Sequence, residues 1–264
     1  MAEGGVSARV GRLVGRAAGA LLDWVYPRHC YHCGVPLDAP GRLVLCGDCF
    51  RAMVENRLDG NVCGRCGLPL SGPEEDGALC IGCLAQERYF DLARAFFAYA
   101  GPVTSVIKSF KFEGNYFLGP RLLRVSLARK WLPEEIVAPE GVVPVPLHPR
   151  RRRERGYDQA LLLAETLAGH FDCKLVKDAL VRTRYTRQQT RLTPTGRRDN
   201  VRGAFAVADG KAVEGRSLLL VDDVATTGAT AEECSKALKK AGCGRLQVLR
   251  SEERRVGKEC ATGC

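Results

Sequence analysis

The amino-acid sequence predicts an α/β domain with a parallel sheet, preceded by a small module that metal ions hold together. Eight cysteines in four evenly spaced pairs within residues 26–90 predict the module. A continuous apolar run from Leu218 to Val221, a short turn and a helical pattern from Ala231 to Ala241 predict a buried parallel strand and its following helix. At 264 residues, the chain is long enough for one ordinary domain and one small module.

The first 25 residues predict an amphipathic helix. Arg9, Arg12 and Arg16 interrupt the apolar run of VSARVGRLVGRAAGALLDWVY at helical intervals. We expect this helix to dock on its own protein, with a membrane-surface or partner helix as the alternative. A secretory signal requires an uninterrupted apolar core, so the interrupted run favours a cytoplasmic protein. No run approaches the ~20 apolar residues of a membrane span.

The paired cysteines predict two zinc sites. Two residues separate the members of every pair. Twelve residues separate the first pair from the second, and 13 residues separate the third pair from the fourth. Without a secretory signal, such pairs are more often metal ligands than disulfides. Two pairs complete a tetrahedral site with no open position, which is typical of structural Zn²⁺. We therefore predict two structural zinc ions in a double zinc ribbon over residues 26–90, held by Cys30, Cys33, Cys46, Cys49, Cys63, Cys66, Cys80 and Cys83.

The pairing within the ribbon has two solutions. Consecutive pairs can share an ion, which we favour, or the pairs can interleave in a cross-brace. His29 and His32 flank the first pair, and we expect them to be spectators because eight thiols already suffice for two ions.

The turn between the predicted strand and helix has the composition of a sugar-phosphate site. Asp222 and Asp223 end the strand, where two carboxylates suit the two hydroxyls of a ribose. Small residues follow, whose backbone N–H groups can close around a phosphate at the positive end of the helix. The predicted binding residues are Asp222, Asp223, Thr226, Thr227, Gly228, Ala229 and Thr230.

This segment resembles the phosphoribosyl pyrophosphate (PRPP) signature of type I phosphoribosyltransferases. The resemblance implies that the acidic pair contacts ribose and that the loop holds its 5-phosphate. Upstream, VVPVPLHPRRRRERGYDQALLLAETLA and RTRYTRQQTRLTPTGRRDNVRGAF, together with the paired cysteines, resemble the ComF family, which is linked to bacterial DNA uptake. The resemblance covers nearly all of residues 20–249 and implies a phosphoribosyltransferase-like domain over 91–249. Asp158 departs from the family pattern, which has an amide there.

Positive charge is concentrated in the second part of the chain. Residues 26–90 carry 6 Lys and Arg against 8 Asp and Glu, whereas residues 91–249 carry 27 against 17. Seven arginines and one acid lie between Arg182 and Arg202, a composition that suits either a hood over a pyrophosphate or a nucleic-acid contact. The candidate phosphate or DNA contacts are Lys108, Lys111, Arg155, Arg184 and Arg197.

Two functions remain open from the sequence. In the first, which we favour, the pocket binds PRPP or another ribose phosphate while the basic surface holds single-stranded DNA during uptake, with a competence helicase or another protein as a further partner. In the second, the protein is an active phosphoribosyltransferase that uses Mg²⁺-bound PRPP. Sequence alone names no catalytic residue for that reaction.

The end of the chain has a different character. The segment RSEERRVGKEC resembles the translated read-through of a common sequencing adapter. We therefore expect residues 250–264 to be a non-native tail, with the natural sequence interrupted near Leu249, and we exclude Cys260 and Cys264 from the ligand sets. Resequencing the source DNA tests this interpretation.

Overall fold

The computed structural model describes residues 29–37, 44–72, 77–186, 193–225 and 228–253, so the predicted N-terminal helix lies outside the described residues. Its centre is a five-stranded sheet in the order β1-β7-β6-β2-β3. All four pairings are parallel, which confirms the predicted sheet class. The strands are β1 (Leu92–Ala98), β2 (Gly141–Pro144), β3 (Lys174–Leu175), β6 (Leu218–Ala225) and β7 (Leu246–Glu253).

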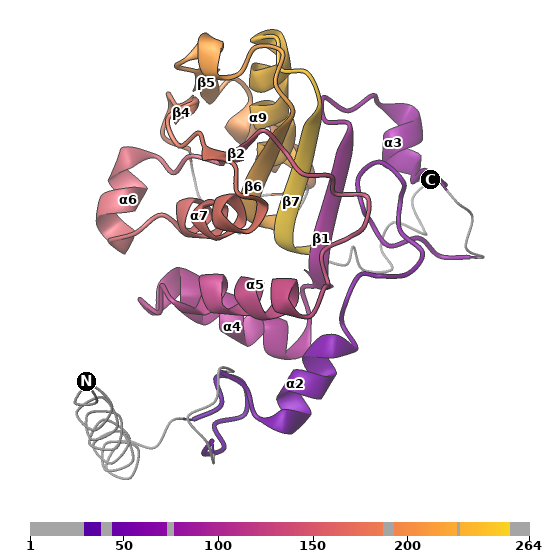
Figure 1. Cartoon of the computed structure of the whole chain (residues 1–264), viewed down its shortest axis with the longest axis vertical. Helices are drawn as coiled ribbons and strands as arrows, with labels where there is room; N and C mark the ends of the chain where they lie inside the picture. Colours follow the sequence, from indigo (N-terminus) through magenta and orange to yellow (C-terminus); the bar gives the residue numbers. More distant parts are fainter. Residues whose placement is uncertain (1–28, 38–43, 73–76, 187–192, 226–227, 254–264) are drawn as a thin grey trace, which may run out of the picture.

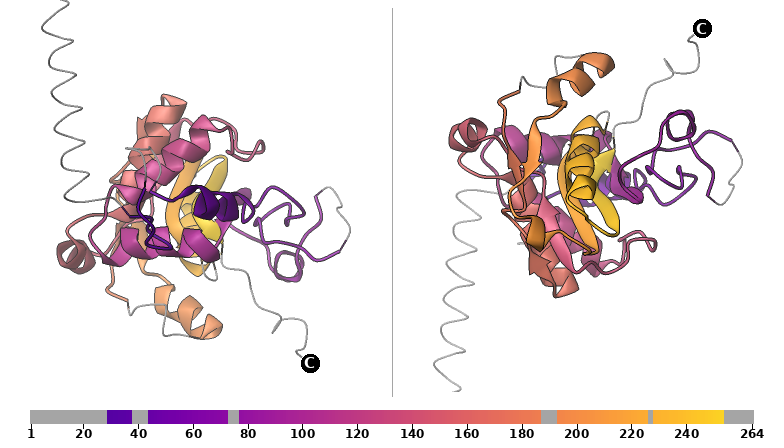
Figure 2. Two further views of the ribbon diagram at one scale, coloured as in Figure 1. Left: turned by 90° about the horizontal axis from the view of Figure 1, so that it is seen from below. Right: turned by 90° about the horizontal axis from the view of Figure 1, so that it is seen from above.

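Both faces of the sheet are covered, as a buried parallel sheet requires. Along β6, Leu219 and Val221 join one hydrophobic cluster, and Leu218 and Leu220 join the other. The first cluster includes residues of the three helices on that face and of one helix of the cysteine module, and the second lies under one helix and a small antiparallel ribbon (Figures 1 and 2). The first face has α4 (Gly101–Phe112), α5 (Leu118–Ala128) and α7 (Gln159–Phe171); the second has α9 (Ala229–Lys240), β4 (Leu180–Arg182), β5 (Phe205–Val207) and the 3-10 turn η2 (Gly210–Ala212).

Two further helices complete the domain. α6 (Pro149–Arg155) follows β2, and α8 (Pro194–Val201) lies between β4 and β5 in the sequence. α6 ends at Gly156, whose φ of 79° is in the left-handed region that glycine adopts most readily. The sharp stop lets the chain turn directly into α7.

The cysteine module packs along one side of the sheet. Its helices are α2 (Gly47–Val54) and α3 (Ile81–Ala85). Phe50 of α2 stacks on Trp131 with ring centres 6.0 Å apart. The segment that joins the two ribbons runs beside β1, where Leu58 N donates to Phe96 O and Ala98 N donates to Asn56 O. The module therefore covers the exposed edge of the outermost strand, which would otherwise offer unpaired backbone groups.

The last strand runs past the expected end of the natural sequence. β7 pairs with β1 and β6 as far as Glu253, and Arg250 is buried between them. Residues 250–253 are therefore part of the sheet in this chain. Residues 254–264 lie outside the described residues, and the adapter origin of the segment stays a prediction.

The packing of α4 against α5 yields a first test. A Cβ on Gly119 would lie 2.5 Å from Cε1 of Phe110, whose buried ring cannot swing away. Gly119→Ala should therefore lower the free energy of unfolding by about 1–3 kcal/mol, the usual cost of overpacking.

Gly169 of α7 is the matched control, because a Cβ added there would meet nothing within 4 Å. Gly169→Ala should stabilise the chain by roughly 0.5–1 kcal/mol through helix propensity. Urea unfolding followed by circular dichroism measures both variants, and equal stabilities for the two would contradict the packing described here.

Candidate functional site

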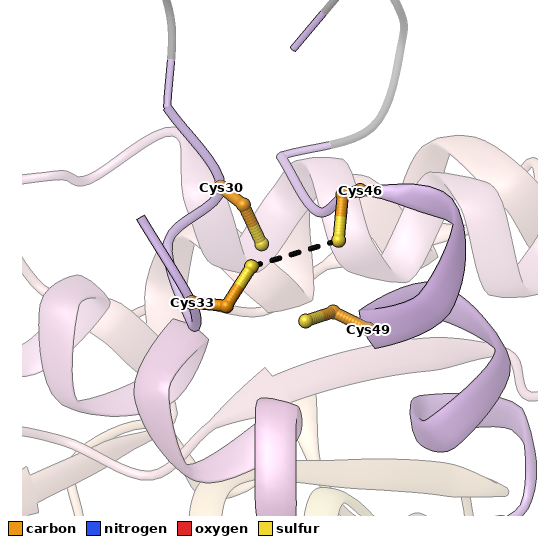
Figure 3. Close-up of side chains that lie close together, drawn as sticks. All are labelled: Cys30, Cys33, Cys46 and Cys49. Atoms are coloured by element: carbon orange, nitrogen blue, oxygen red, sulfur yellow. Dashed lines mark hydrogen bonds between the residues drawn. The ribbon is translucent and has the colours of Figure 1, made fainter. Parts of the chain in front are cut away.

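The first four-cysteine site lies between the start of the module and α2. Figure 3 shows the side chains of Cys30, Cys33, Cys46 and Cys49 gathered around one point. Their sulfur atoms all lie within 4.8 Å of one another, and Sγ of Cys33 is 3.7 Å from Sγ of Cys46. Four thiolates at ~2.3 Å from one Zn²⁺ in a tetrahedron are about 3.8 Å apart, so this donor set fits zinc.

The second site repeats the first. Cys63, Cys66, Cys80 and Cys83 also lie within 4.8 Å of one another, with Sγ of Cys66 3.6 Å from Sγ of Cys80. Consecutive pairs share a site, so the ribbon is sequential and not a cross-brace. His32 belongs to neither group, since its Nδ1 lies 2.9 Å from Ser105 Oγ on α4.

Backbone N–H groups prepare one thiol in each site for metal binding. Burial opposes ionisation of Cys30, but N–H groups of Cys33, Cys46 and His32 outweigh burial and lower its pKa to about 6. Cys63 is buried in the same way, and N–H groups of Cys66, Cys80 and Arg65 lower its pKa to about 6. With pKa values of about 6, these two cysteines are mostly ionised at neutral pH. Thiolate is the form of cysteine that binds metal.

Arg94 fixes the second ribbon to the sheet. Its buried guanidinium, on β1, donates from Nη1 to Cys63 O and Gly64 O at 3.3 Å each. It also forms an ion pair of 2.7 Å with Glu135. Gly67 approaches the same strand so closely that a Cβ there would lie 2.6 Å from Ala93 O. The second zinc knuckle is thus held directly against β1.

The carboxyl ends of β2 and β6 form the other site. The two strands are neighbours, and Val145 N donates to Val221 O at 2.9 Å just beyond β2. From β2 the chain continues through α6 to α7 on one face, whereas from β6 it continues to α9 on the other. In open parallel sheets, such a reversal of direction opens the crevice in which ligands bind.

The predicted sugar-phosphate residues lie at this edge. Asp222 is largely buried and Asp223 follows it, but they do not end the strand as expected, because β6 continues through Val224 and Ala225 in its pairing with β7. Gly228 is the N-cap of α9 with φ 68°, so α9 begins with its positive end beside the strand. Ala229 and Thr230 form its first turn, whereas Thr226 and Thr227 lie outside the described residues.

Arg182 is a cation at this edge that the sequence did not single out. Burial lowers the pKa of its guanidinium, the charge of Arg151 lowers it further, and Cys234 and Asp222 act in the opposite direction. Its Nη2 donates to Thr186 Oγ1, and its buried Nε has no hydrogen-bond partner. In the sequence, Arg182 is marked only by its place in an arginine-rich stretch. Its proximity to Asp222 depends on how β4 folds back on the sheet, which the sequence does not show.

The other basic candidates are distributed over several elements. Lys108 is exposed and Lys111 half-buried on α4, and Arg155 ends α6. Arg184 Nη2 donates to Asn200 O at 3.1 Å and to Arg202 O at 2.9 Å, so it holds the end of α8. Arg197 is buried within α8. The structure therefore does not bring these five residues together into one cluster.

Comparison with known proteins identifies both parts of the chain. The double zinc ribbon domain model matches residues 21–85, and the phosphoribosyl transferase domain model matches residues 158–253. Competence protein F of Haemophilus influenzae is 34% identical over 190 residues, which are 70% of this chain and 82% of that protein. DNA utilization protein YhgH of Escherichia coli strain K12 is 32% identical over 227 residues, 84% of this chain and 95% of that protein. The chain belongs to the ComF family.

Two further similarities are more distant. Competence protein ComFC of Bacillus subtilis is 26% identical over 70% of this ComF-family chain and 75% of its own length. Among solved structures, the glutamine PRPP amidotransferase from B. subtilis, complexed with ADP and GMP, is 24% identical over 50% of this chain and 26% of that chain. Its TM-score is 0.34, which is too low to support an argument from the overlay.

The position of Asp158 at the start of α7 is compatible with its departure from the family pattern. Asp158 is the N-cap of α7, and its Oδ1 accepts from Leu161 N at 3.2 Å. A carboxylate serves this role as well as an amide does. Beside it, Tyr157 donates through its hydroxyl to Phe110 O, and Arg155 Nη1 donates to Gln159 Oε1 at 3.0 Å. These contacts fasten the α6–α7 turn to the end of α4.

Among the described residues, none of the helices is both long enough and apolar enough to cross a membrane.

Zinc retention should depend on pH in a direction that the thiol pKa values set. The pKa of Cys30 and of Cys63 is depressed to about 6, so their contribution to zinc binding is present at higher pH and is lost as the pH falls through that value. We expect retention to be constant above pH 7 and to fall between about pH 6 and pH 5.

The zinc released at each pH can be read from the absorbance of a zinc-binding dye after rapid gel filtration, with two ions per chain as the starting value. Cys243→Ser is the matched control, because burial raises the pKa of that thiol to about 11 and it belongs to neither zinc group. Zinc loss that begins at pH 8 would contradict the assignment.

Proposed function

We propose that this ComF-family protein binds PRPP or another ribose 5-phosphate at the carboxyl ends of β2 and β6, and that it acts in the cytoplasm on single-stranded DNA during DNA uptake. The observation that carries the first part is the burial of Asp222 in β6, six residues before the N-cap of α9, at the edge of the sheet where the chain direction reverses. A buried carboxylate followed in the chain by a positive helix end suits the ribose and the phosphate of such a ligand.

Each residue then has a distinct role. Asp222 and Asp223 accept hydrogen bonds from the ribose hydroxyls, and the turn from Thr226 to Thr230 surrounds the 5-phosphate with backbone N–H groups. Arg182 and Arg151 lie close enough to affect each other electrostatically, and they supply positive charge for a second phosphate group. When PRPP is the ligand, Mg²⁺ accompanies it and neutralises the pyrophosphate.

The role in DNA uptake has separate support. Similar proteins are named for competence and for DNA utilization, and positive charge is concentrated in residues 91–249 of this chain. A backbone rich in phosphate is the partner that such a surface attracts. Ile81 and Leu84 of α3 are exposed on the second ribbon, so this part of the module suits a protein partner such as a competence helicase.

An active Mg²⁺-dependent phosphoribosyltransferase is the second candidate. The match of the phosphoribosyl transferase domain model to residues 158–253 favours it. In that reaction a nucleophile attacks the anomeric carbon of PRPP and pyrophosphate leaves, and the protein contributes positioning and charge stabilisation. An assay of pyrophosphate release across nucleobases and amines decides this question: turnover supports the enzyme, and silence across the whole set argues against it.

Calorimetry with PRPP and Mg²⁺ tests the pocket. The intact chain should bind, and a chain with Asp222→Ala and Asp223→Ala should lose at least about 100-fold in affinity, because two groups that accept from the ribose are gone. Glu165→Ala, at an exposed position of α7, is the control and should bind as the intact chain does. Because Asp222 is largely buried, a melting curve must first establish that the double variant is folded.

Retained affinity in the folded double variant would rule out this ribose site. If the intact chain does not bind PRPP, the turn between β6 and α9 has a structural role only.

The salt dependence of DNA binding tests the second part. Anisotropy of a labelled thymidine oligomer should report an affinity that falls as salt rises, with a logarithmic slope of about −2 for three phosphate contacts, since each contact on a single strand contributes roughly −0.7. A slope near zero would contradict a role for the basic surface.

A further inference from the structure

Exposed aromatic side chains gather at the two ends of the basic helix α6. Among the described residues, five aromatic side chains are markedly exposed, and four of them flank this helix: Phe112, Tyr116, Phe117 and Tyr185. In Figure 1, α6 projects from the body between β4 on one side and the ends of α4 and α5 on the other. Large exposed apolar groups in one region of a monomer mark an interaction site more often than a random surface does.

The first aromatic group lies at the C-terminal end of α6. The Arg155 guanidinium lies over the ring of Phe112, with its Cζ 5.5 Å from the ring centre, and Phe112 remains 61% exposed. Tyr116 is 58% exposed and contacts both Phe117 and Tyr157, with ring centres 6.1 Å apart in each case. Tyr157 is anchored by its hydroxyl on Phe110 O, so these rings are held in place before any ligand arrives.

The second aromatic group lies at the N-terminal end of α6. Cζ of Arg150 and of Arg151 lie 5.1 and 5.8 Å from the ring centre of Tyr185. His148 contacts the same ring edge-on at 5.1 Å, and Tyr185 remains 42% exposed. Arg151 Nη2 also donates to Thr186 O at 3.0 Å, which ties the helix to the segment that follows β4.

The arginines of α6 lie between the two aromatic groups. The helix PRRRRER carries five arginines and one glutamate, and that glutamate is paired with Arg150 at 3.0 Å. Arg152 and Arg153 are exposed between the two ends. At 1.5 Å per residue, α6 is about 10 Å long, so a short extended strand can reach both aromatic groups at once.

We propose that α6 and the four exposed aromatic side chains at its ends form a binding face for single-stranded DNA. Bases stack on Tyr185 and on the Phe112, Tyr116 and Phe117 group, and phosphates lie along the arginines of α6. This inference rests on the proposed function and places the DNA contact on one surface. Alternating rings and cations are the combination that single strands require, whereas a duplex keeps the faces of its bases inside the stack.

The experiment replaces the rings without changing the charge. Phe112→Leu combined with Tyr116→Leu removes the two most exposed rings of the first aromatic group, and Tyr185→Leu removes the exposed ring of the second. Each change should weaken binding of a labelled thymidine oligomer by about fivefold or more, since stacking of one base contributes roughly that much or more. The slope against salt should stay the same, because every arginine remains.

Tyr89→Leu is the matched control. Tyr89 is also exposed and also pairs with a cation, Lys236, whose Nζ lies 5.6 Å from the ring centre, but it lies beside α9 and not α6. It should bind DNA as the intact chain does. All variants should retain two zinc ions and the melting temperature of the intact chain. Tyr89→Leu and the Phe112→Leu, Tyr116→Leu pair should also retain its PRPP affinity, because these rings lie neither at the turn between β6 and α9 nor over Arg151.

The outcomes separate the two proposals. Binding by the intact chain that is unchanged in the ring variants overturns this face and leaves DNA binding elsewhere on the protein. No binding by the intact chain ends the DNA role and this inference together. Duplex DNA that competes as well as the thymidine oligomer would also overturn it, because stacking on the bases would then be unnecessary. A uridine oligomer that competes equally well would overturn it by assigning the face to single-stranded RNA.

Discussion

The parallel pairing of β2 with β6 is the constraint on which the candidate site depends. These strands send their chains to opposite faces of the sheet, so α6 and the turn before α9 begin at the same edge. The segment after Asp222 and the arginines that follow β2 therefore start from the same edge of the sheet. The hydrophobic alternation along β6, with Leu219 and Leu220 buried on opposite faces, fixes the register that makes this possible.

The two zinc sites are the second constraint, because the ribbons contain too few apolar side chains to fold without metal. Structural Zn²⁺ contributes roughly 10–16 kcal/mol to a small finger, which is enough to order such a module. Arg94 of β1 connects the second ribbon to the sheet through its hydrogen bonds to Cys63 O and Gly64 O. The module then covers β1, so metal binding and the integrity of the main domain are linked.

Local patterns could be predicted from the sequence, and tertiary contacts could not. The cysteine spacing predicted both ligand sets because two-residue knuckles are local, and the apolar run at Leu218 predicted the central strand for the same reason. The scattering of Arg184 and Arg197 was not predictable, since their partners are backbone carbonyls and buried surroundings that only the fold brings close. Arg182 and the aromatic groups beside α6 could not be singled out because their residues come from separate segments.

Hydrogen–deuterium exchange with and without PRPP and Mg²⁺ tests the central claim most directly, because it reports on the segments that follow β2 and β6 in one measurement. Slower exchange in peptides that contain Asp222 to Glu232 and, together with them, in peptides that contain Leu147 to Tyr157 is the result that a shared site between β6 and β2 requires. Unchanged exchange in both regions, or slowing confined to the zinc ribbons, would contradict it.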